Sequence, residues 1–279
     1  MIKYIAISVV KNEERNISDM VGSVLNQTIP PRAFIIIDGG STDRTQEILE
    51  RLFKPYPSTL LLPLVVPDDP KLHKWENQRN ATHLAVKVAE TGTPDWEWLL
   101  TIDGDVVLPP DYVERLTSDL WRYVGIVSGV PHGGSVWRGR ASNVARLYRR
   151  ECWEQINGLA PVLHWDTWAI LEAYRWGFLV RSDPTVKFIE RRPSTRESLH
   201  EWYLSGWARH FLGFPLPHTV FAGLTHISEN PPILGALVMF FTQLVLSVTG
   251  RRRPFDKDYY KKTRNIIIKE MKQRILEVL

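Results

Sequence analysis

Two aspartates separated by one glycine, Asp103-Gly104-Asp105, end an apolar run of the sequence. The run, residues 96–102, has the length and composition of a buried strand. Residues i and i+2 of an extended chain point to the same side, so the two carboxylates can face one another. Magnesium and manganese prefer oxygen ligands, and magnesium commonly takes one or two carboxylates together with substrate phosphates. The pattern predicts a metal–diphosphate site, with Gly104 letting a diphosphate approach the backbone; a solvated turn is the alternative.

A second acid, Asp38, ends another apolar run, residues 33–37. Open α/β sheets bind ligands at the carboxyl ends of their strands, so Asp38 is expected to accept hydrogen bonds from a base or a ribose. The first predicted strand, residues 2–10, is followed by a polar segment, residues 11–16, that contains no glycine. A dinucleotide-binding Rossmann unit needs a glycine-rich turn at this point, so a nicotinamide or flavin enzyme is disfavoured.

Charged residues at two predicted helix starts have two interpretations each. Glu13 and Glu14 either favour the first turn of a helix through its dipole or bind a ligand. Arg79 lies in the first turns of a helix predicted over residues 75–89, where it is a surface charge or reaches a phosphate.

The order of these motifs resembles the family 2 glycosyltransferases. The motifs are a strand followed by Lys11-Asn12-Glu13, a strand followed by Asp-Gly-Gly-Ser-Thr-Asp (38–43), a helix with Arg79-Asn80-Ala81, and a strand followed by Asp103-Gly104-Asp105. The resemblance covers roughly residues 1–180. It implies the α/β GT-A fold, a Rossmann-like central mixed sheet flanked by helices. It also implies inverting transfer from a nucleotide sugar with Mn²⁺ or Mg²⁺ as cofactor.

The resemblance assigns roles to single residues. Those that would bind the nucleotide sugar are Val10, Asn12, Glu13, Asp38, Arg79, Asp103, Gly104 and Asp105. Within this set, Asp103 and Asp105 would hold the metal.

Asp166 matches the catalytic base of the family. The family pattern is two glycines, then Glu-Asp opening a helix, then an Arg and a Gly; this chain has Asn157-Gly158, His164-Trp165-Asp166, Arg175 and Gly177. Asn157 and Trp165 depart from the pattern. Inversion needs a base that takes the acceptor hydroxyl's proton on the face opposite the leaving diphosphate, and one carboxylate can do this. The alternative is that Asp166 only caps a helix over residues 167–176.

The acceptor or phosphate region is assigned to Gly158, His164, Trp165 and Arg196. Arg196 belongs to a basic linker, residues 191–196, which either closes over the donor diphosphate or is solvated.

The last third of the chain has the features of a membrane-interface segment. Residues 233–249 are mostly apolar, but a helix of that length at about 1.5 Å per residue falls short of the roughly 30 Å hydrocarbon core. A membrane-embedded or interfacial hairpin is predicted, with a buried core helix or an oligomer contact as the alternative. Residues 256–279 have the pattern of a basic amphipathic helix on an anionic membrane, which a dimer-forming helix shares.

The charge distribution and the cysteine content indicate which partners and which cellular compartment to expect. The net charge is +4, and residues 251–279 hold ten Lys and Arg against four Asp and Glu. Basicity confined to the tail favours an anionic membrane surface over nucleic acid as a partner. The single cysteine, Cys152, excludes an intrachain disulfide framework and fits a reducing compartment. No signal peptide is expected before the first strand.

Together these features predict a catalytic domain over residues 1–196 and membrane-interface helices over residues 197–279. The predicted activity is metal-dependent, inverting transfer of a single sugar, from GDP-mannose ahead of a UDP-sugar, to a lipid-linked (polyprenyl or dolichyl) saccharide. It would act at the cytoplasmic face of the cell membrane as a peripheral or monotopic protein, with a homo-oligomer as an option. The alternative is a catalytically inactive nucleotide-sugar-binding scaffold that oligomerises through its C-terminal helices. A sugar-phosphate nucleotidylyltransferase would need a glycine-rich basic loop after the first strand, which residues 11–16 lack.

Overall fold

The computed structural model describes residues 2–55, 61–118, 123–134, 139–192, 198–227 and 229–278. The chain divides into two compact units, Met1–Arg192 and Pro193–Leu279, called here the first and second unit. This division lies close to the one predicted after residue 196.

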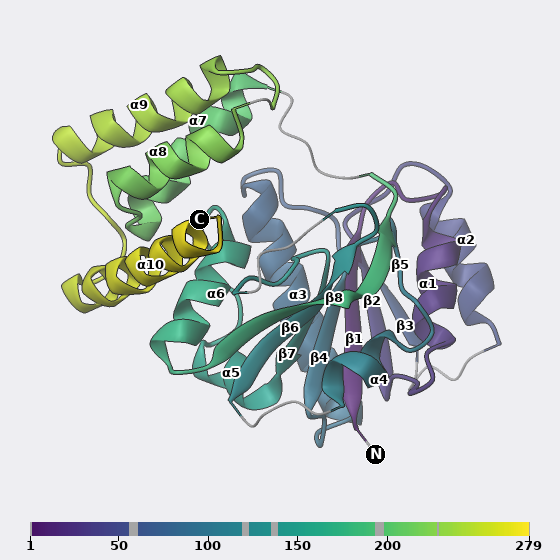
Figure 1. Ribbon diagram of the computed structural model, residues 1–279. Helices are drawn as coiled ribbons and strands as arrows, with labels where there is room; N and C mark the ends of the chain where they lie inside the picture. Colours follow the sequence, from purple (N-terminus) through teal and green to yellow (C-terminus); the bar gives the residue numbers. More distant parts are fainter. Residues whose placement is uncertain are drawn as a thin grey trace. The chain divides into compact units, whose positions relative to one another are not determined.

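The described part of the first unit forms one eight-stranded mixed sheet (Figure 1). Its strands are β1 (Tyr4–Val10), β2 (Ala33–Asp38), β3 (Leu61–Val65), β4 (Trp98–Ile102), β5 (Val106–Val107), β6 (Val124–Pro131), β7 (Ala145–Arg149) and β8 (Leu179–Glu190). They lie in the order β3-β2-β1-β4-β7-β6-β8-β5. The first four in this order are parallel, β7 is antiparallel to both of its neighbours, and β6 pairs in parallel with β8.

Helices flank this sheet (Figure 1). They are α1 (Ile17–Leu25), α2 (Thr45–Phe53), α3 (Lys74–Gly92), α4 (Tyr112–Thr117), α5 (Arg150–Gln155) and α6 (Trp165–Arg175). Every residue of β2 is buried, as expected of a parallel strand with both faces covered. The apolar runs of β1, β2 and β4 therefore form the centre of the core, and only the ends of these strands are left for polar chemistry.

The second unit is helical, with α7 (Leu199–Leu212), α8 (Leu216–Thr225), α9 (Leu234–Val248) and α10 (Lys257–Val278). A capping box starts α7, since the Ser198 hydroxyl accepts from Glu201 N and the Glu201 carboxylate accepts from Ser198 N. Trp202 of α7 is fully buried and its indole N–H donates to the carbonyl of Asn230 at 2.8 Å. A Cβ on Gly235 would come within 2.3 Å of the Trp202 ring, so a glycine is needed where α9 crosses α7.

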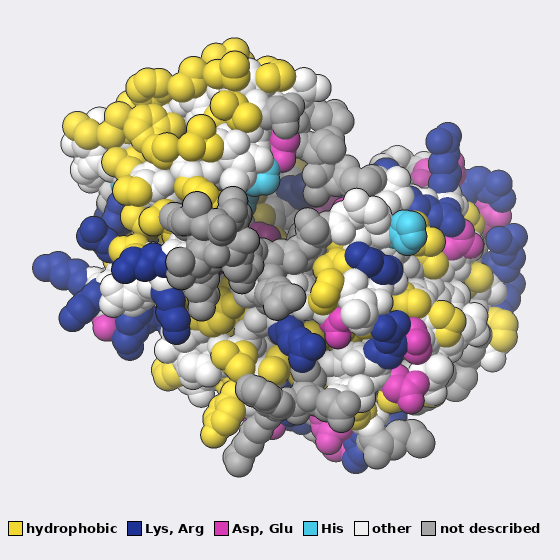
Figure 2. Space-filling model, in the orientation of Figure 1, with side chains coloured by type: hydrophobic (Ala, Val, Ile, Leu, Met, Phe, Trp, Pro, Cys, Tyr) yellow, Lys and Arg dark blue, Asp and Glu magenta, His cyan; other side chains and the backbone are white. Residues whose placement is uncertain are grey.

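The outer side of α9 is an apolar stripe formed by Leu234, Leu237, Phe241, Val245 and Val248, all of them exposed. Figure 2 shows hydrophobic side chains gathered over this helix. Residues 234–248 therefore form a helix with one side buried in the core of the second unit and an exposed apolar side, which the predicted interfacial segment and the alternative of an oligomer contact both need. No helix in the described part of the chain combines the length and the apolar character that a membrane crossing requires.

The inward side of α9 carries Gln243, which is buried. Its amide donates to the carbonyl of Phe214, and its side-chain oxygen accepts from the Thr219 hydroxyl. The one amide of this helix is thus satisfied inside the unit and does not interrupt the apolar stripe.

Tyr259, Thr263, Ile267 and Glu270 of α10 are buried. Two of these four residues are polar, so the buried side of this helix is not purely apolar. A membrane-facing or dimer-forming role for α10 stays a prediction.

Candidate active site

The polar ends of β1 and β2 meet at one edge of the sheet. Val10, the last residue of β1, is in register with Asp38, the last residue of β2. Gly39 N donates to the Val10 carbonyl at 2.9 Å, which continues the pairing past both strands. The segments after the two strands therefore lie side by side, as the sequence predicted for strand-end ligand sites.

Asp38 organises the turn after β2. Its Oδ1 accepts from both Ser41 N at 2.8 Å and the Ser41 hydroxyl at 2.7 Å, and that hydroxyl accepts from Asn12 N at 2.8 Å. Asn12 has a φ of 57°, in the left-handed region that asparagine tolerates, and its Oδ1 accepts from Thr42 N. One hydrogen-bonded chain thus joins the predicted ligands Asp38 and Asn12.

The second oxygen of Asp38, Oδ2, is buried and has no hydrogen-bond partner among the described residues. A buried acceptor left unsatisfied is unfavourable, and a ligand N–H or O–H would relieve that cost. A cleft of about 220 Å³ lies at the ends of β1, β2 and β3 and is bounded by Gly39, the residue after Asp38. It is lined by Val9, Gly39, Val66, Pro67, Asp68, Asp69, Leu72, Asn77, Asn80, Ala81 and Leu84. The geometry suits the binding of a nucleoside beside Asp38.

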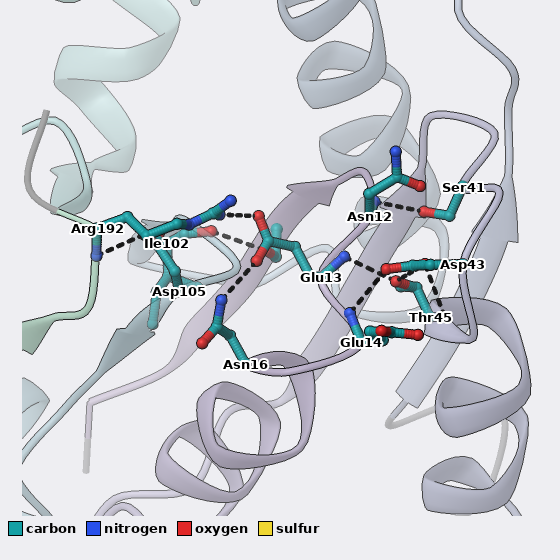
Figure 3. Close-up of polar contacts among 11 residues, drawn as sticks. Asn12, Glu13, Glu14, Asn16, Ser41, Asp43, Thr45, Ile102, Asp105 and Arg192 are labelled. Atoms are coloured by element: carbon teal, nitrogen blue, oxygen red, sulfur yellow. Dashed lines mark hydrogen bonds and ion pairs between the residues drawn. The ribbon is translucent and has the colours of Figure 1, made fainter.

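Glu13 and Asp105 are joined by one arginine, Arg192 (Figure 3). The guanidinium of Arg192 forms an ion pair with Glu13, and its Nε lies 3.2 Å from Oδ2 of Asp105. Glu13 is held from its other side by Thr45, whose hydroxyl accepts from Glu13 N, and by Asn16, whose amide donates to Oε2 at 2.9 Å. Two acids from distant parts of the sequence are therefore fixed at one place, with a cation between them.

Gly104 makes this proximity possible. A Cβ at this position would lie 2.8 Å from Cγ of Glu13 and 3.0 Å from Cγ1 of Val10. Any other residue would push Glu13 away, so the glycine between the two aspartates is required by packing as well as by access for a ligand.

The pKa of the Asp103 carboxyl group is raised by its surroundings. Burial, followed by the charges of Asp105 and Glu190, raises its pKa to about 7, against an opposing effect of Lys74. Its backbone N–H donates to the Val144 carbonyl at 2.8 Å, which fixes the turn after β4. A divalent cation would stabilise both ionised aspartates, so these residues fit the expected metal.

The described residues contain no group of three or more His, Cys, Asp or Glu side chains arranged to hold a metal. A cation at Asp103 and Asp105 would thus complete its coordination with substrate phosphates and water, as magnesium commonly does.

Asp166 lies in the first turn of α6, one residue after the helix begins. The residue at the N-cap is His164, in the left-handed conformation with a φ of 59°, and it forms no side-chain cap. The Asp166 carboxylate is partly exposed and has no hydrogen bond or ion pair with any residue that the structure describes. The alternative that Asp166 is the N-cap is wrong, because the helix starts before it at Trp165.

Arg79 lies beside the segment that contains Gly158. Nε of Arg79 donates to the carbonyl of Leu159 at 3.0 Å, and Leu159 N donates to Nε2 of His83 at 3.0 Å. Gly158 has a φ of 69°, and a Cβ there would come within 2.4 Å of the His83 ring. In this structure Arg79 anchors the segment before α6, and Arg196 falls outside the described residues.

Two charged residues of this region, Glu190 and Arg146, were not predicted from the sequence. Arg192 was noted as part of a basic linker, but its contacts with Glu13 and Asp105 were not predicted. Glu190 ends β8 opposite Val106 of β5, a short pairing with no clear signal in the sequence.

A mixed sheet with these acids at its strand ends is the architecture of nucleotide-sugar-binding GT-A proteins. The model of glycosyl transferase family 2 matches residues 5–177, more than half of the chain. The chain belongs to glycosyl transferase family 2, which confirms the resemblance and the fold drawn from the sequence.

Known proteins agree with this assignment. Succinoglycan biosynthesis protein ExoA of Rhizobium meliloti (strain 1021) is 37% identical over 109 residues, which are 39% of this chain and 29% of ExoA. The chain therefore matches less than a third of the length of that relative.

Solved structures show the same fold at low identity. Mannosyltransferase PcManGT from Pyrobaculum calidifontis, in complex with GDP-Man and Mn²⁺, superposes with a TM-score of 0.57 at 17% identity, over 94% of this chain and 83% of that one. S. aureus TarS 1-349 in complex with UDP-GlcNAc gives a TM-score of 0.50 at 13% identity, over 96% and 81%.

Proposed function

We propose that this protein is an inverting, metal-dependent glycosyltransferase that moves a single sugar from a nucleotide sugar to a lipid-linked saccharide. The observation that carries the proposal is the gathering of Asp38, Glu13, Asp103 and Asp105 at one edge of the sheet. Family membership supports glycosyl transfer as the reaction class.

The nucleoside and the metal of the donor are proposed to bind at the ends of two different strands. Asp38, with its unsatisfied Oδ2, accepts a hydrogen bond from the nucleoside next to the cleft. Asp103 and Asp105 would hold Mn²⁺ or Mg²⁺, and the cation would neutralise the charge that develops on the leaving diphosphate. Arg192, which pairs with Asp105 and Glu13 in this structure, would be able to bind a phosphate oxygen if a cation took its place at Asp105.

Asp166 acts as the base. Its carboxylate takes the proton of the acceptor hydroxyl as that oxygen bonds to the anomeric carbon, while the bond from this carbon to the diphosphate breaks. The absence of a partner for this carboxylate among the described residues supports the role, because a paired carboxylate would be a weaker base.

GDP-mannose is the preferred donor and a UDP-sugar the second choice. The support is fold-level likeness to a mannosyltransferase bound to GDP-Man and Mn²⁺ and, with a lower TM-score, to a protein bound to UDP-GlcNAc. A lipid-linked acceptor at the cytoplasmic membrane face agrees with the exposed apolar stripe of α9 and the basic residues 251–253 that follow it.

The substitution Asp166→Asn tests the base. It should lower Mn²⁺-dependent turnover of the donor about 10²- to 10⁴-fold, the usual contribution of general acid–base catalysis, and leave donor binding unchanged. Asp95→Asn, which removes an exposed aspartate paired with Lys3, is the matched control and should keep full turnover. Wild-type turnover in Asp166→Asn would exclude Asp166 as the base.

A further inference from the structure

Arg146 is a fully buried arginine in β7, with 1% of its surface exposed. Its guanidinium donates four hydrogen bonds, and each acceptor is neutral. The acceptors are the carbonyls of Ala141 at 2.6 Å, Ser142 at 3.1 Å and Asp166 at 3.0 Å, and the hydroxyl of Tyr148 at 3.1 Å.

This environment is unusual for a buried charge. Buried arginines are normally paired with a carboxylate, because desolvating an unpaired cation is costly. Arg146 has no ion pair with any acid in the described ranges, so its charge is balanced by carbonyl and hydroxyl dipoles and by the Tyr148 ring, whose centroid lies 5.7 Å from the guanidinium carbon. A planar group with five fixed N–H donors can hold several backbone segments at once, which a lysine cannot do.

The segments that Arg146 joins are those that flank the reaction. Asp166 lies in the first turn of α6, and the carbonyls of Ala141 and Ser142 lie in the segment that leads into β7. Arg146 itself is in register with Thr101 of β4, two residues before Asp103. Arg146 therefore connects two parts of the site: its backbone pairs with β4, the strand that leads to the predicted metal ligands, and its guanidinium binds the helix turn that carries the predicted base.

We propose that Arg146 is a positioning residue, which holds the first turn of α6 at a fixed distance from the end of β4 and so sets where the Asp166 carboxylate stands. This inference rests on the proposed role of Asp166 as base. Arg146 itself touches no substrate, and removing its bonds would let the first turn of α6 move. Misplacement of a catalytic group by about 1 Å commonly costs about 10²-fold in rate.

The conservative variant Arg146→Lys tests the proposal, because it keeps the positive charge and loses the planar guanidinium with its five N–H donors. Arg149→Lys is the matched control: it lies in the same strand, donates to the Val124 carbonyl at 2.9 Å and covers the Trp98 ring at 4.5 Å, but has no hydrogen bond to α6. Tyr148→Phe removes one acceptor of Arg146 and leaves the bond to Asp166 in place. Each variant is made in the full chain.

Two readouts are measured. The first is hydrogen exchange of residues 164–170, which needs no activity. Arg146→Lys should speed exchange there at least tenfold, while Arg149→Lys and Tyr148→Phe leave it unchanged. The second is Mn²⁺-dependent hydrolysis of GDP-mannose. Arg146→Lys should lower kcat 10- to 100-fold with KM unchanged. The double variant Arg146→Lys, Asp166→Asn should have the same kcat as Asp166→Asn alone.

Unchanged exchange of residues 164–170 in Arg146→Lys would overturn the proposal. So would an equal fall of kcat in Arg149→Lys, or a fall in Arg146→Lys that adds fully to that of Asp166→Asn. Full turnover in the single variant Asp166→Asn would instead overturn the proposed base, and the exchange of α6 would still decide whether Arg146 anchors this turn.

Discussion

Two glycines determine which side chains can approach the backbone in the first unit. Gly104 leaves the space that Glu13 fills, and Gly158 leaves the space that the His83 ring fills. Gly104 lies between two residues with predicted chemical roles, and at both glycines the missing Cβ lets a polar or charged side chain approach the backbone. The position of Glu13 next to Asp105 is a direct result of the missing Cβ at Gly104.

His83 makes the stability of the first unit depend on pH. Burial, with a contribution from Arg79, lowers the pKa of His83 below its usual 6.5. Below pH 6.5 the His83 imidazole is therefore protonated more readily in the unfolded chain than in the folded chain. The free energy of unfolding should then fall as the pH drops below 6.5. Protonation would also remove the acceptor for Leu159 N.

Urea unfolding of His83→Gln against wild type at pH 7.5 and pH 5 checks this prediction. The variant should lose less stability between the two values, while the exposed-site control His132→Gln should behave as wild type does. An equal loss in His83→Gln and wild type would show that His83 does not titrate within this range.

The strand-end acids were predictable at the residue scale, and their cationic partners were not. Asp38, Asp103 and Asp105 follow apolar runs, so chain order alone places them at one edge of a parallel sheet. Arg192 meets Glu13 across 179 positions of sequence, and no local pattern encodes such a contact. Arg146 stands in a strand at a position where an arginine normally predicts exposure.

Among the elements, the parallel strands were the most predictable. β1, β2 and β4 are near-continuous apolar runs, as parallel buried strands are. β7 was missed because two of its five residues are arginines, and β8 because Pro184 and a shift of register interrupt its alternation. The missed strands are those that pair out of the simple parallel order.

The apolar stripe on α9 leads to a prediction about membrane binding. Transferring a Leu or Phe side chain out of water contributes about 1.5–3 kcal/mol, so replacing two such residues should weaken binding to lipid about 100-fold or more. The double variant Leu237→Gln, Phe241→Gln is therefore expected to partition poorly into vesicles of phosphatidylcholine and phosphatidylglycerol.

Flotation with these vesicles measures the effect. The control is Leu179→Gln, an exposed leucine of the first unit, which should bind as wild type does. Unchanged flotation of the double variant would exclude the stripe as an anchor, and a shift from oligomer to monomer in light scattering would assign it to self-association.

For the molecule as a whole, the sequence match to the family lies within the first unit, whereas the superposition on PcManGT covers 94% of the chain and so includes both units. The family model ends at residue 177, inside the first unit, so family membership applies to the sheet and its strand-end acids. The second unit lies outside that match, and it carries both the α9 stripe and most of the excess positive charge. Family membership therefore supports the donor chemistry, whereas the proposed lipid linkage of the acceptor and the proposed membrane contact rest on residues of the second unit.

The most direct test of the central claim is calorimetric titration of the full chain with GDP-mannose, UDP-glucose and UDP-GlcNAc, with and without Mn²⁺. If the strand-end acids form a metal–diphosphate site, one donor should bind only with Mn²⁺. Asp105→Asn should weaken that binding at least tenfold, and the exposed-site control Asp95→Asn should not. If no nucleotide sugar bound with or without metal, or if binding were independent of both Mn²⁺ and Asp105, the strand-end acids would not form a metal–diphosphate site.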